Sequence, residues 1–339
     1  MKNACKNLED IKKDLRKKHY ALVGNTSAVQ ICNWTKNSLR GGSGCWKEKF
    51  YGIDSSRCCE MSPAVMWCEN SCLHCWRPIE MNLGMKLPVI DNPKEIIDKI
   101  IQEREKQLIG FGGSKKVSKK KLEKAFSPNL FTFSLSGEAT LYPRLGEMIK
   151  ELRKRKIITF LVTNGQNPEA LKKLEKEKAL PTQLTISTNA PNKELFNFWH
   201  KSKRKDAWKK FNETLKLIRQ LKGKTRRVLR LTLVAKREGK EKTAGITNMS
   251  EENTGEYIQL IKKAQPDFIH VKGFMSIGYA RKRLPYIKQP WHHEIKEFAK
   301  KLEKKLQKNK LKYKILAEEE RSCVVILGKS KKGMKIRKS

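Results

Sequence analysis

The chain has 339 residues and a formal net charge of +40, from 75 Lys and Arg against 35 Asp and Glu, so it is long enough for one large α/β domain with additions. This charge predicts a polyanionic partner such as RNA or DNA, because each lysine or arginine that contacts a phosphate releases a counterion; the alternative is that the lysines only solvate the surface. The polar N-terminus lacks a secretory signal and no apolar run nears the roughly 18 residues of a spanning helix, so we expect a cytoplasmic protein without a membrane partner.

The N-terminal segment is predicted to form a basic helix over residues 7–15, and Cys5 fits no pattern there. A segment rich in Gly, Trp and Cys follows, in which twelve residues separate Cys32 from Cys45 and Cys45 from Cys58. This spacing is too long for one loop, so the three thiols can meet only through the fold. They fit an iron-sulfur cluster with one open iron or a zinc site with Cys59 as fourth ligand, and the residues alone leave both interpretations open.

Three further cysteines, Cys68, Cys72 and Cys75, have C-x3-C-x2-C spacing. Three thiolates are one too few to close a four-iron cubane, so one iron stays open to the amino and carboxylate groups of a cofactor such as S-adenosylmethionine. A zinc site with Cys58, Cys59 or His74 as fourth ligand is the alternative. No second C-x2-C pair follows, and this favours the cluster.

From Met61 onward the chain alternates short apolar runs with amphipathic ones. Six strand–helix units predict a parallel sheet wrapped by helices, an α/β fold in the form of a partial TIM-like (β/α)6 barrel. The predicted strands are Pro63–Trp67, Leu130–Leu135, Ile157–Val162, Gln183–Ser187, Val228–Val234 and Phe268–Val271. The predicted helices are Pro93–Leu108, Leu141–Lys154, Pro168–Glu177, Ala207–Lys222, Ser250–Ala264 and Trp291–Gln307.

Unusual polar residues fall at the C-terminal ends of these strands, on the edge where parallel barrels build their active sites. Besides Cys68 they are Ser136, Gly137, Glu138, Thr163, Asn164, Ser187, Asn189 and Lys272. Gly137 lets backbone approach a bound ligand, and Glu138 offers a carboxylate or carbonyl to the ammonium group of a cofactor. We therefore predict that these residues bind the cofactor.

The remaining stretches are predicted to be peripheral. Residues 110–121 and 236–245 have the composition of exposed lysine-rich loops. Tyr313–Leu316 and Val324–Leu327 are predicted edge strands, and residues 328–339 a disordered basic tail. This divides the chain into an N-terminal helix with a cysteine-rich extension (1–60), a core (61–310) and a C-terminal part (311–339).

The cysteine motif, Ser136-Gly137-Glu138 and the six units resemble the radical S-adenosylmethionine superfamily. From about Tyr20 to Leu327 the chain resembles, more narrowly, the archaeal tRNA 4-demethylwyosine synthase family. The specific motifs are the cysteine series Cys32, Cys45, Cys58; the run from Cys45 to Ile53; Arg57-Cys58 with Met61-Ser62-Pro63; Leu135 to Glu138 with Thr140 to Pro143; Val271-Lys272-Gly273; and Pro290-Trp291-His292.

The resemblance implies two [4Fe-4S] clusters, one on Cys68, Cys72 and Cys75 that cleaves S-adenosylmethionine, and one on Cys32, Cys45 and Cys58. It implies condensation of pyruvate with N1-methylguanosine-37 in the anticodon loop of tRNA(Phe), with Lys47 forming a Schiff base to pyruvate. It also implies an external electron donor such as flavodoxin or ferredoxin, and we expect a monomer.

Three departures from the family pattern stand out. Asn189 replaces an expected acidic residue, Ala139 replaces a usual proline, and residues 236–248 form a longer connection. None of them touches the cysteines or Lys47. Two other functions stay open at this stage, a different radical S-adenosylmethionine enzyme that modifies RNA, and a zinc-dependent RNA-binding module.

Overall fold

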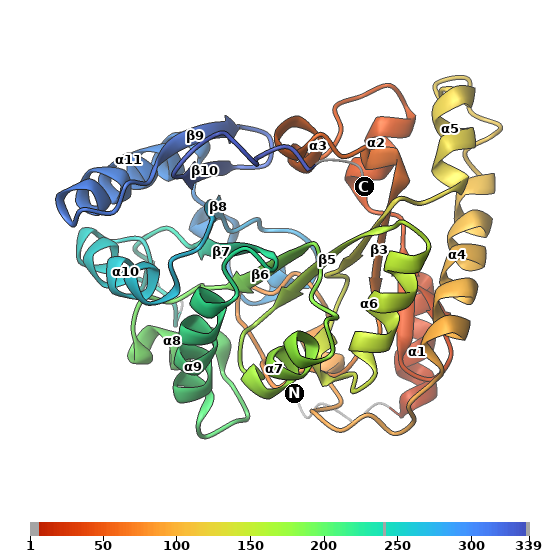
Figure 1. Ribbon diagram of the computed structural model, residues 1–339, viewed down its shortest axis with the longest axis horizontal. Coiled ribbons are helices and arrows are strands. Elements are labelled where there is room, and N and C mark those ends of the chain that lie inside the picture. Colours follow the sequence, from red (N-terminus) through yellow and green to blue (C-terminus); the bar gives the residue numbers. More distant parts are fainter. Residues whose placement is uncertain (1–6, 240–241, 337–339) are drawn as a thin grey trace.

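The computed structural model describes residues 7–239 and 242–336, so Cys5, residues 240 and 241 of the predicted loop and the last three residues of the predicted tail lie outside it. Its ten strands form one sheet in the order β1-β2-β3-β4-β5-β6-β7-β8-β10-β9. The strands from β3 to β8 run parallel, and the flanking pairs are antiparallel. Figure 1 shows the helices wrapped around the outside of this curved sheet. The predicted partial barrel is therefore confirmed.

The strands follow the predicted runs closely, with one exception. They are β1 (Ala21–Val23), β2 (Ser27–Gln30), β3 (Cys58–Ser62), β4 (Leu130–Phe133), β5 (Ile158–Thr163), β6 (Gln183–Ser187), β7 (Arg226–Leu233), β8 (Phe268–Gly273), β9 (Lys314–Glu319) and β10 (Val324–Gly328).

The exception is the first barrel strand, which was predicted at Pro63–Trp67 and lies at Cys58–Ser62 instead. Its register with β4 pairs Cys58 with Leu130 and Met61 with Phe133. Pro63 has no N–H to donate and follows directly, so the ladder ends there. The prediction was wrong because the strand begins with Cys58 and Cys59. Both had been interpreted as possible metal ligands and not as buried strand residues.

Most helices match the prediction within a few residues. They are α1 (Leu8–Lys17), α2 (Asn33–Leu39), α3 (Trp46–Tyr51), α4 (Pro93–Ile109), α5 (Lys119–Phe126), α6 (Leu145–Lys154), α7 (Pro168–Lys176), α8 (Lys193–His200), α9 (Ala207–Gln220), α10 (Glu251–Ala264) and α11 (His292–Lys308). Short 3₁₀ turns lie at η1 (Ser55–Arg57), η2 (Ile79–Met81), η3 (Ala139–Leu141), η4 (Gly278–Lys282) and η5 (Tyr286–Lys288). In the described part of the chain no helix is long and apolar enough to cross a membrane.

Several short elements escaped prediction, namely the β1–β2 hairpin, α2, α3, α5 and α8. Helix α5 overlaps the predicted loop at residues 110–121, because Ser118 caps its N-terminus and Leu122 and Ala125 bury one face. The described part of the 236–245 loop has no regular structure, as predicted.

The C-terminal tail is ordered where the structure describes it, contrary to prediction. Met334 is buried, the Ile336 N–H donates to the Tyr51 carbonyl at 2.9 Å, and Arg226 donates to the Met334 carbonyl at 2.8 Å. The buried methionine and these hydrogen bonds offset the entropy cost of ordering the tail. Its basic composition alone had favoured disorder. The tail thus packs onto α3.

Alternation along the strands separates two sets of side chains. Residues such as Cys59, Met61, Phe131 and Leu229 face the helices and form the main apolar core. Cys58, Leu130, Phe160, Val228 and Phe268 face the inside at the N-terminal ends of the strands, where they pack with residues of α3. The polar positions further along the strands therefore line the inside of the barrel between its two ends.

Candidate active site

The loop with the C-x3-C-x2-C motif follows β3 at the C-terminal edge of the sheet. The Asn82 side chain clamps it, because its Oδ1 accepts from the Cys68 N–H at 3.2 Å and its Nδ2 donates to the carbonyls of Cys68 at 2.8 Å and Asn70 at 3.0 Å. On the other side the N–H groups of Ser71 and Leu73 donate to the end of α8. Arg283 donates to the carbonyls of Cys75 and Leu73. The loop is therefore held in place before any metal binds.

The three thiols of this loop suit an iron-sulfur cluster. Burial raises the pKa of Cys68, Cys72 and Cys75 above the usual range, so they are neutral until a metal displaces the protons. The Cys68 Sγ already accepts hydrogen bonds from the Asn70 N–H at 3.4 Å and from Asn164 Nδ2 at 3.9 Å. Hydrogen bonds to a ligating sulfur are one of the factors that set the reduction potential of such a cluster.

Glu138 lies beside this loop, and its carboxylate accepts four hydrogen bonds. Its carboxylate accepts from the N–H and hydroxyl of Thr140, from the Thr163 hydroxyl at 2.7 Å and from the Asn164 N–H at 2.8 Å. Burial is the largest effect on this carboxyl and raises its pKa, while these donors act against it. Glu138 thus joins the ends of β4 and β5 and brings Thr163 and Asn164 to the loop, with half-buried Ser136 two residues away.

Gly137 is required for packing of the cysteine loop. Its φ is +70°, and a Cβ there would overlap the carbonyl oxygen of Ala64 and crowd that of Trp67. The structure therefore accounts for this glycine by its contact with the cysteine loop, in addition to the ligand approach predicted from the sequence.

Gly137→Ala is expected to lower the unfolding free energy by more than about 2 kcal/mol, since the left-handed conformation alone costs about 1–2 kcal/mol. Urea unfolding of the metal-free protein measures this change. Gly223→Ala is the matched control, because Gly223 has φ +80° and nothing within 4 Å of its Cβ position. Equal losses in both variants would show that close packing against Ala64 contributes nothing.

Asn189, the departure from the family pattern, bridges two histidines. Its Oδ1 accepts from the Thr232 N–H at 3.2 Å, which orients the amide so that Nδ2 faces His74 Nε2 at 3.0 Å and His200 Nε2 at 3.5 Å. Burial lowers the pKa of His74 to about 3 and of His200 to about 4, so both rings are neutral acceptors. The Asn189 amide can donate to an unprotonated Nε2, whereas a carboxylate at this position could pair only with a ring that carries a proton there.

One face of the cysteine loop also offers an alternative metal geometry. The ligand atoms of Cys72, His74 and His200 lie within 4.8 Å of one another. These three residues could bind a zinc ion, so the zinc site with His74 as a ligand stays an alternative at this loop. Cys58, the other ligand considered there, lies at the opposite end of β3 and belongs to a different cavity. Cys59 faces the outer core and is excluded by the alternation along β3.

The last two predicted cofactor residues lie inside the barrel. The Ser187 hydroxyl accepts from Arg230 at 3.4 Å, and Lys272 donates to the Ser322 carbonyl at 2.5 Å. Burial lowers the pKa of Lys272 to about 8. Arg230 escaped sequence analysis, although its charge helps to lower the pKa of His74, His270 and Lys272. The sequence did hold one indication of this role, because a charged arginine stands among leucine and β-branched residues within a predicted strand.

The second cysteine set does converge, at the opposite end of the barrel. Cys32, Cys45 and Cys58 line one small cavity together with Lys47. Cys32 and Cys45 are the N-cap residues of α2 and α3, and Cys58 begins β3. Buried Arg104, which the sequence did not single out, donates to the carbonyls of Cys58 and Ser56 and fixes this segment.

This cavity fits a cluster better than a structural zinc ion. Its described lining residues include no histidine and no fourth cysteine, whereas a structural zinc site needs four ligands. Cys59 points to the other side of the sheet and cannot supply the fourth. Burial raises the pKa of Cys32 to about 12, so this thiol, too, must lose its proton to a metal.

Half-buried Lys47 lines this cavity, and its Nζ lies 5.7 Å from the centre of the Phe160 ring. Burial acts to lower the pKa of Lys47, but the negative charges of Cys58, Cys45 and Cys32 outweigh it and raise the pKa. The lysine is therefore a charged ammonium group when the thiolates are present.

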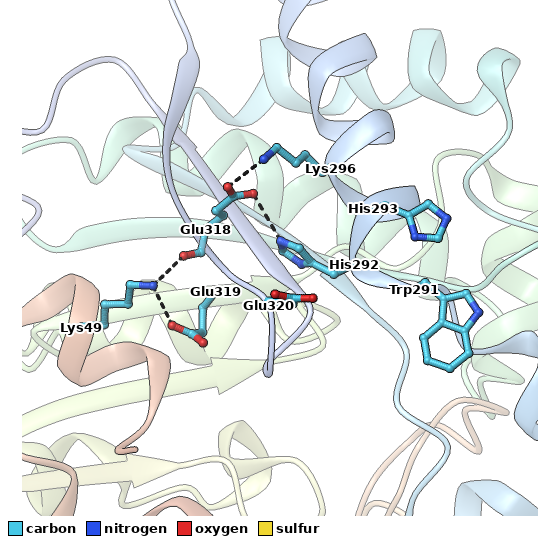
Figure 2. Close-up of a pocket in the computed structure, with 8 residues that line it drawn as sticks. All are labelled: Lys49, Trp291, His292, His293, Lys296, Glu318, Glu319 and Glu320. Atoms are coloured by element: carbon cyan, nitrogen blue, oxygen red, sulfur yellow. Dashed lines mark hydrogen bonds and ion pairs between the residues drawn. The ribbon is translucent and has the colours of Figure 1, made fainter. Parts of the chain in front are cut away.

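An open groove lies elsewhere, between α3, α11 and the β9–β10 hairpin. Figure 2 shows Lys49 bound to the carboxylate of Glu319 and the carbonyl of Glu318, and His292 and Lys296 bound to the carboxylate of Glu318. The contacts of Lys49 tie α3 to β9. The groove therefore supports the helix that carries Lys47.

Comparisons with known proteins cover nearly the whole chain. A model of the radical SAM superfamily matches residues 63–264, and a model described as wyosine base formation matches residues 263–329. The chain is 42% identical over 320 residues to the S-adenosyl-L-methionine-dependent tRNA 4-demethylwyosine synthase of Pyrococcus abyssi, covering 94% of this chain and 88% of the relative. It is 33% identical to the enzyme of the same name from Methanocaldococcus jannaschii, covering 94% and 96%.

Two solved structures are similar in fold. One, described as TYW1 with a lysine-pyruvate adduct bound, has a TM-score of 0.79 and 30% identity and covers 95% of this chain and 96% of that one. The other, described as archaeal TYW1, has a TM-score of 0.72 and 29% identity, covering 98% and 99%.

Proposed function

The chain belongs to the S-adenosyl-L-methionine-dependent tRNA 4-demethylwyosine synthase family of radical SAM enzymes, and from this we propose which residues carry the reaction on tRNA. Cys68, Cys72 and Cys75 bind the [4Fe-4S] cluster on which S-adenosylmethionine is cleaved, and Cys32, Cys45 and Cys58 bind a second [4Fe-4S] cluster. The observation that carries this assignment is the pair of three-cysteine sites at opposite ends of one barrel.

When bound, the first cluster and S-adenosylmethionine supply a 5′-deoxyadenosyl radical by one-electron cleavage of the sulfonium. That cofactor is positioned at the C-terminal edge of the sheet by residues that follow the strands, namely Ser136, Gly137, Glu138, Thr163, Asn164, Ser187 and Asn189. Pyruvate is the second substrate and is held by Lys47. A lysine-pyruvate adduct in the similar TYW1 structure supports this role. Lys272, whose Nζ donates to the Ser322 carbonyl, also belongs to the set of cofactor-binding residues.

The nucleic acid substrate is the anticodon loop of tRNA(Phe) with N1-methylguanosine at position 37. Loop bases can be splayed out of the stack and held in a pocket. The net charge of +40 supports RNA binding. The protein works as a monomer in the cytoplasm and takes its electrons from an external flavodoxin or ferredoxin.

Mass spectrometry of tRNA nucleosides tests this function. After anaerobic incubation with S-adenosylmethionine, pyruvate and methylated tRNA, we expect the tricyclic base, whose mass includes two pyruvate carbons. A radical methyltransferase or methylthiotransferase would add neither carbon. Iron and sulfide analysis separates the zinc alternative, since protein with zinc in place of iron would form no product.

A further inference from the structure

The exposed apolar side chains of this basic protein are concentrated next to the cysteine loop. Of the ten large apolar residues that the structure shows as exposed, five lie between positions 76 and 90. We call these five the apolar rim: Trp76 at 41% exposure, Leu83 at 39%, Met85 at 41%, Val89 at 46% and Ile90 at 38%. Exposed apolar side chains that gather on one surface mark an interaction site.

The apolar rim is connected to the cysteine loop at Trp76 and Leu83. Trp76 follows Cys75, and the Leu83 N–H donates to the Met66 carbonyl at 2.8 Å. The Gly84 N–H donates at 2.9 Å to the same Asn82 oxygen that accepts from Cys68. A partner that covers Trp76 and Leu83 would therefore sit next to the segment that carries the cluster ligands.

A different segment, next to Glu69 of the loop, carries the cations that suit RNA. Residues 201–205 include Lys201, Lys203, Arg204 and Lys205, and the Lys203 N–H donates to the Glu69 carbonyl at 2.8 Å. RNA binding draws on such cations, because phosphate contacts dominate its affinity. From residue 83 to 90 the only charge is Lys86, which is exposed. Apolar side chains of this kind suit a protein surface.

We propose that the apolar rim is the docking surface for a small acidic one-electron carrier protein. This rests on the proposed function, in which one electron leaves the reduced carrier for the cluster on Cys68, Cys72 and Cys75. Its final acceptor is the C5′–S bond of S-adenosylmethionine, which breaks to methionine and the 5′-deoxyadenosyl radical.

Three properties point to this occupant. Electron tunnelling falls off steeply with distance, so the carrier must dock beside the cluster. Electron-transfer complexes use small interfaces, which a rim of five side chains can provide. The net charge of +40 attracts an acidic partner and speeds its encounter, while the apolar contacts fix its position.

Met85→Glu and Val89→Glu test the surface, with Ile109→Glu as control. Ile109 is 65% exposed at the far end of α4, so the control makes the same change of charge away from the rim. Formation of 5′-deoxyadenosine is measured twice for each protein, once with reduced flavodoxin at varied concentration and once with dithionite. Iron content and the Kd for methylated tRNA are measured alongside.

The rim variants should raise the KM for flavodoxin by about tenfold or more, because a new carboxylate on the rim would repel the acidic carrier. Their dithionite-driven rate, iron content and tRNA affinity should match the wild type, and Ile109→Glu should change nothing. An unchanged KM for flavodoxin would overturn the proposal, and so would a loss of tRNA affinity in the rim variants, which would assign the surface to RNA. A wild-type protein inactive even with dithionite would overturn the proposed function itself.

Discussion

Lys47→Ala is expected to abolish the attachment of labelled pyruvate that borohydride traps, and to lower formation of the tricyclic base by at least about 10³-fold. The reason is that a covalently held reactant gains an effective molarity of roughly 10⁵ M or more, which the variant forfeits. Cleavage of S-adenosylmethionine should persist, since Lys47 lies in the cavity of Cys32, Cys45 and Cys58 at the other end of the barrel. Mass spectrometry of the reduced protein and of 5′-deoxyadenosine measures the two effects separately.

The pH dependence of trapping follows from the charge of Lys47. Only a neutral amine attacks a carbonyl, and the pKa of Lys47 is raised, so its neutral fraction rises about tenfold per pH unit below that pKa. The initial rate of trapping should therefore increase steadily from pH 7 to pH 9. A rate that levels off near pH 8 would instead match Lys272, whose pKa burial lowers to about 8.

Lys272→Ala is the matched control for this experiment. Judged by pKa alone, Lys272 is the better nucleophile, because about half of it would be neutral at pH 8. Its Nζ is engaged by the Ser322 carbonyl, however, and it is not among the residues that line the cysteine cavity. We expect trapping to survive in Lys272→Ala. Loss of trapping in this variant and retention in Lys47→Ala would reverse the two roles.

The barrel was predictable because its strands and helices obey simple periodicities. Five of the six parallel strands lie within two residues of their predicted starts. The polar residues were expected at one edge because parallel strands present their C-terminal ends together, and Glu138, Thr163 and Asn164 do meet there. The strand predicted at Pro63–Trp67 was misplaced because Cys58 and Cys59 were considered only as metal ligands. They were therefore not counted as buried positions of a strand.

Long-range polar contacts were not predictable from the sequence. Several polar side chains hold a loop or strand at another position of the chain through hydrogen bonds, as Arg283 does with the carbonyl of Cys75. The others are Asn82, Arg104 and Arg230. An asparagine or arginine in a basic chain carries no sign of its burial until the fold brings a carbonyl to it. The convergence of Cys32, Cys45 and Cys58 depended likewise on α2 and α3, which are too short to give a periodic pattern.

Cys72→Ala is expected to lower cleavage of S-adenosylmethionine by at least about 10³-fold and to halve the iron, from about eight to about four per chain, because a four-iron cluster needs its thiolates. The remaining cluster on Cys32, Cys45 and Cys58 should persist, since the two sites lie at opposite ends of β3. Iron and sulfide analysis and the yield of 5′-deoxyadenosine measure these effects.

Cys58→Ala should have the reciprocal result. It removes the cluster beside Lys47 and leaves the loop of Cys68 intact, so iron again halves while 5′-deoxyadenosine still forms without the tricyclic base. Cys59→Ala is the control, because this neighbouring thiol faces the outer core and should keep all the iron. Loss of both clusters from Cys58→Ala would show that the two sites assemble as one. Loss of iron from Cys59→Ala would contradict the strand alternation on which the choice between Cys58 and Cys59 depends.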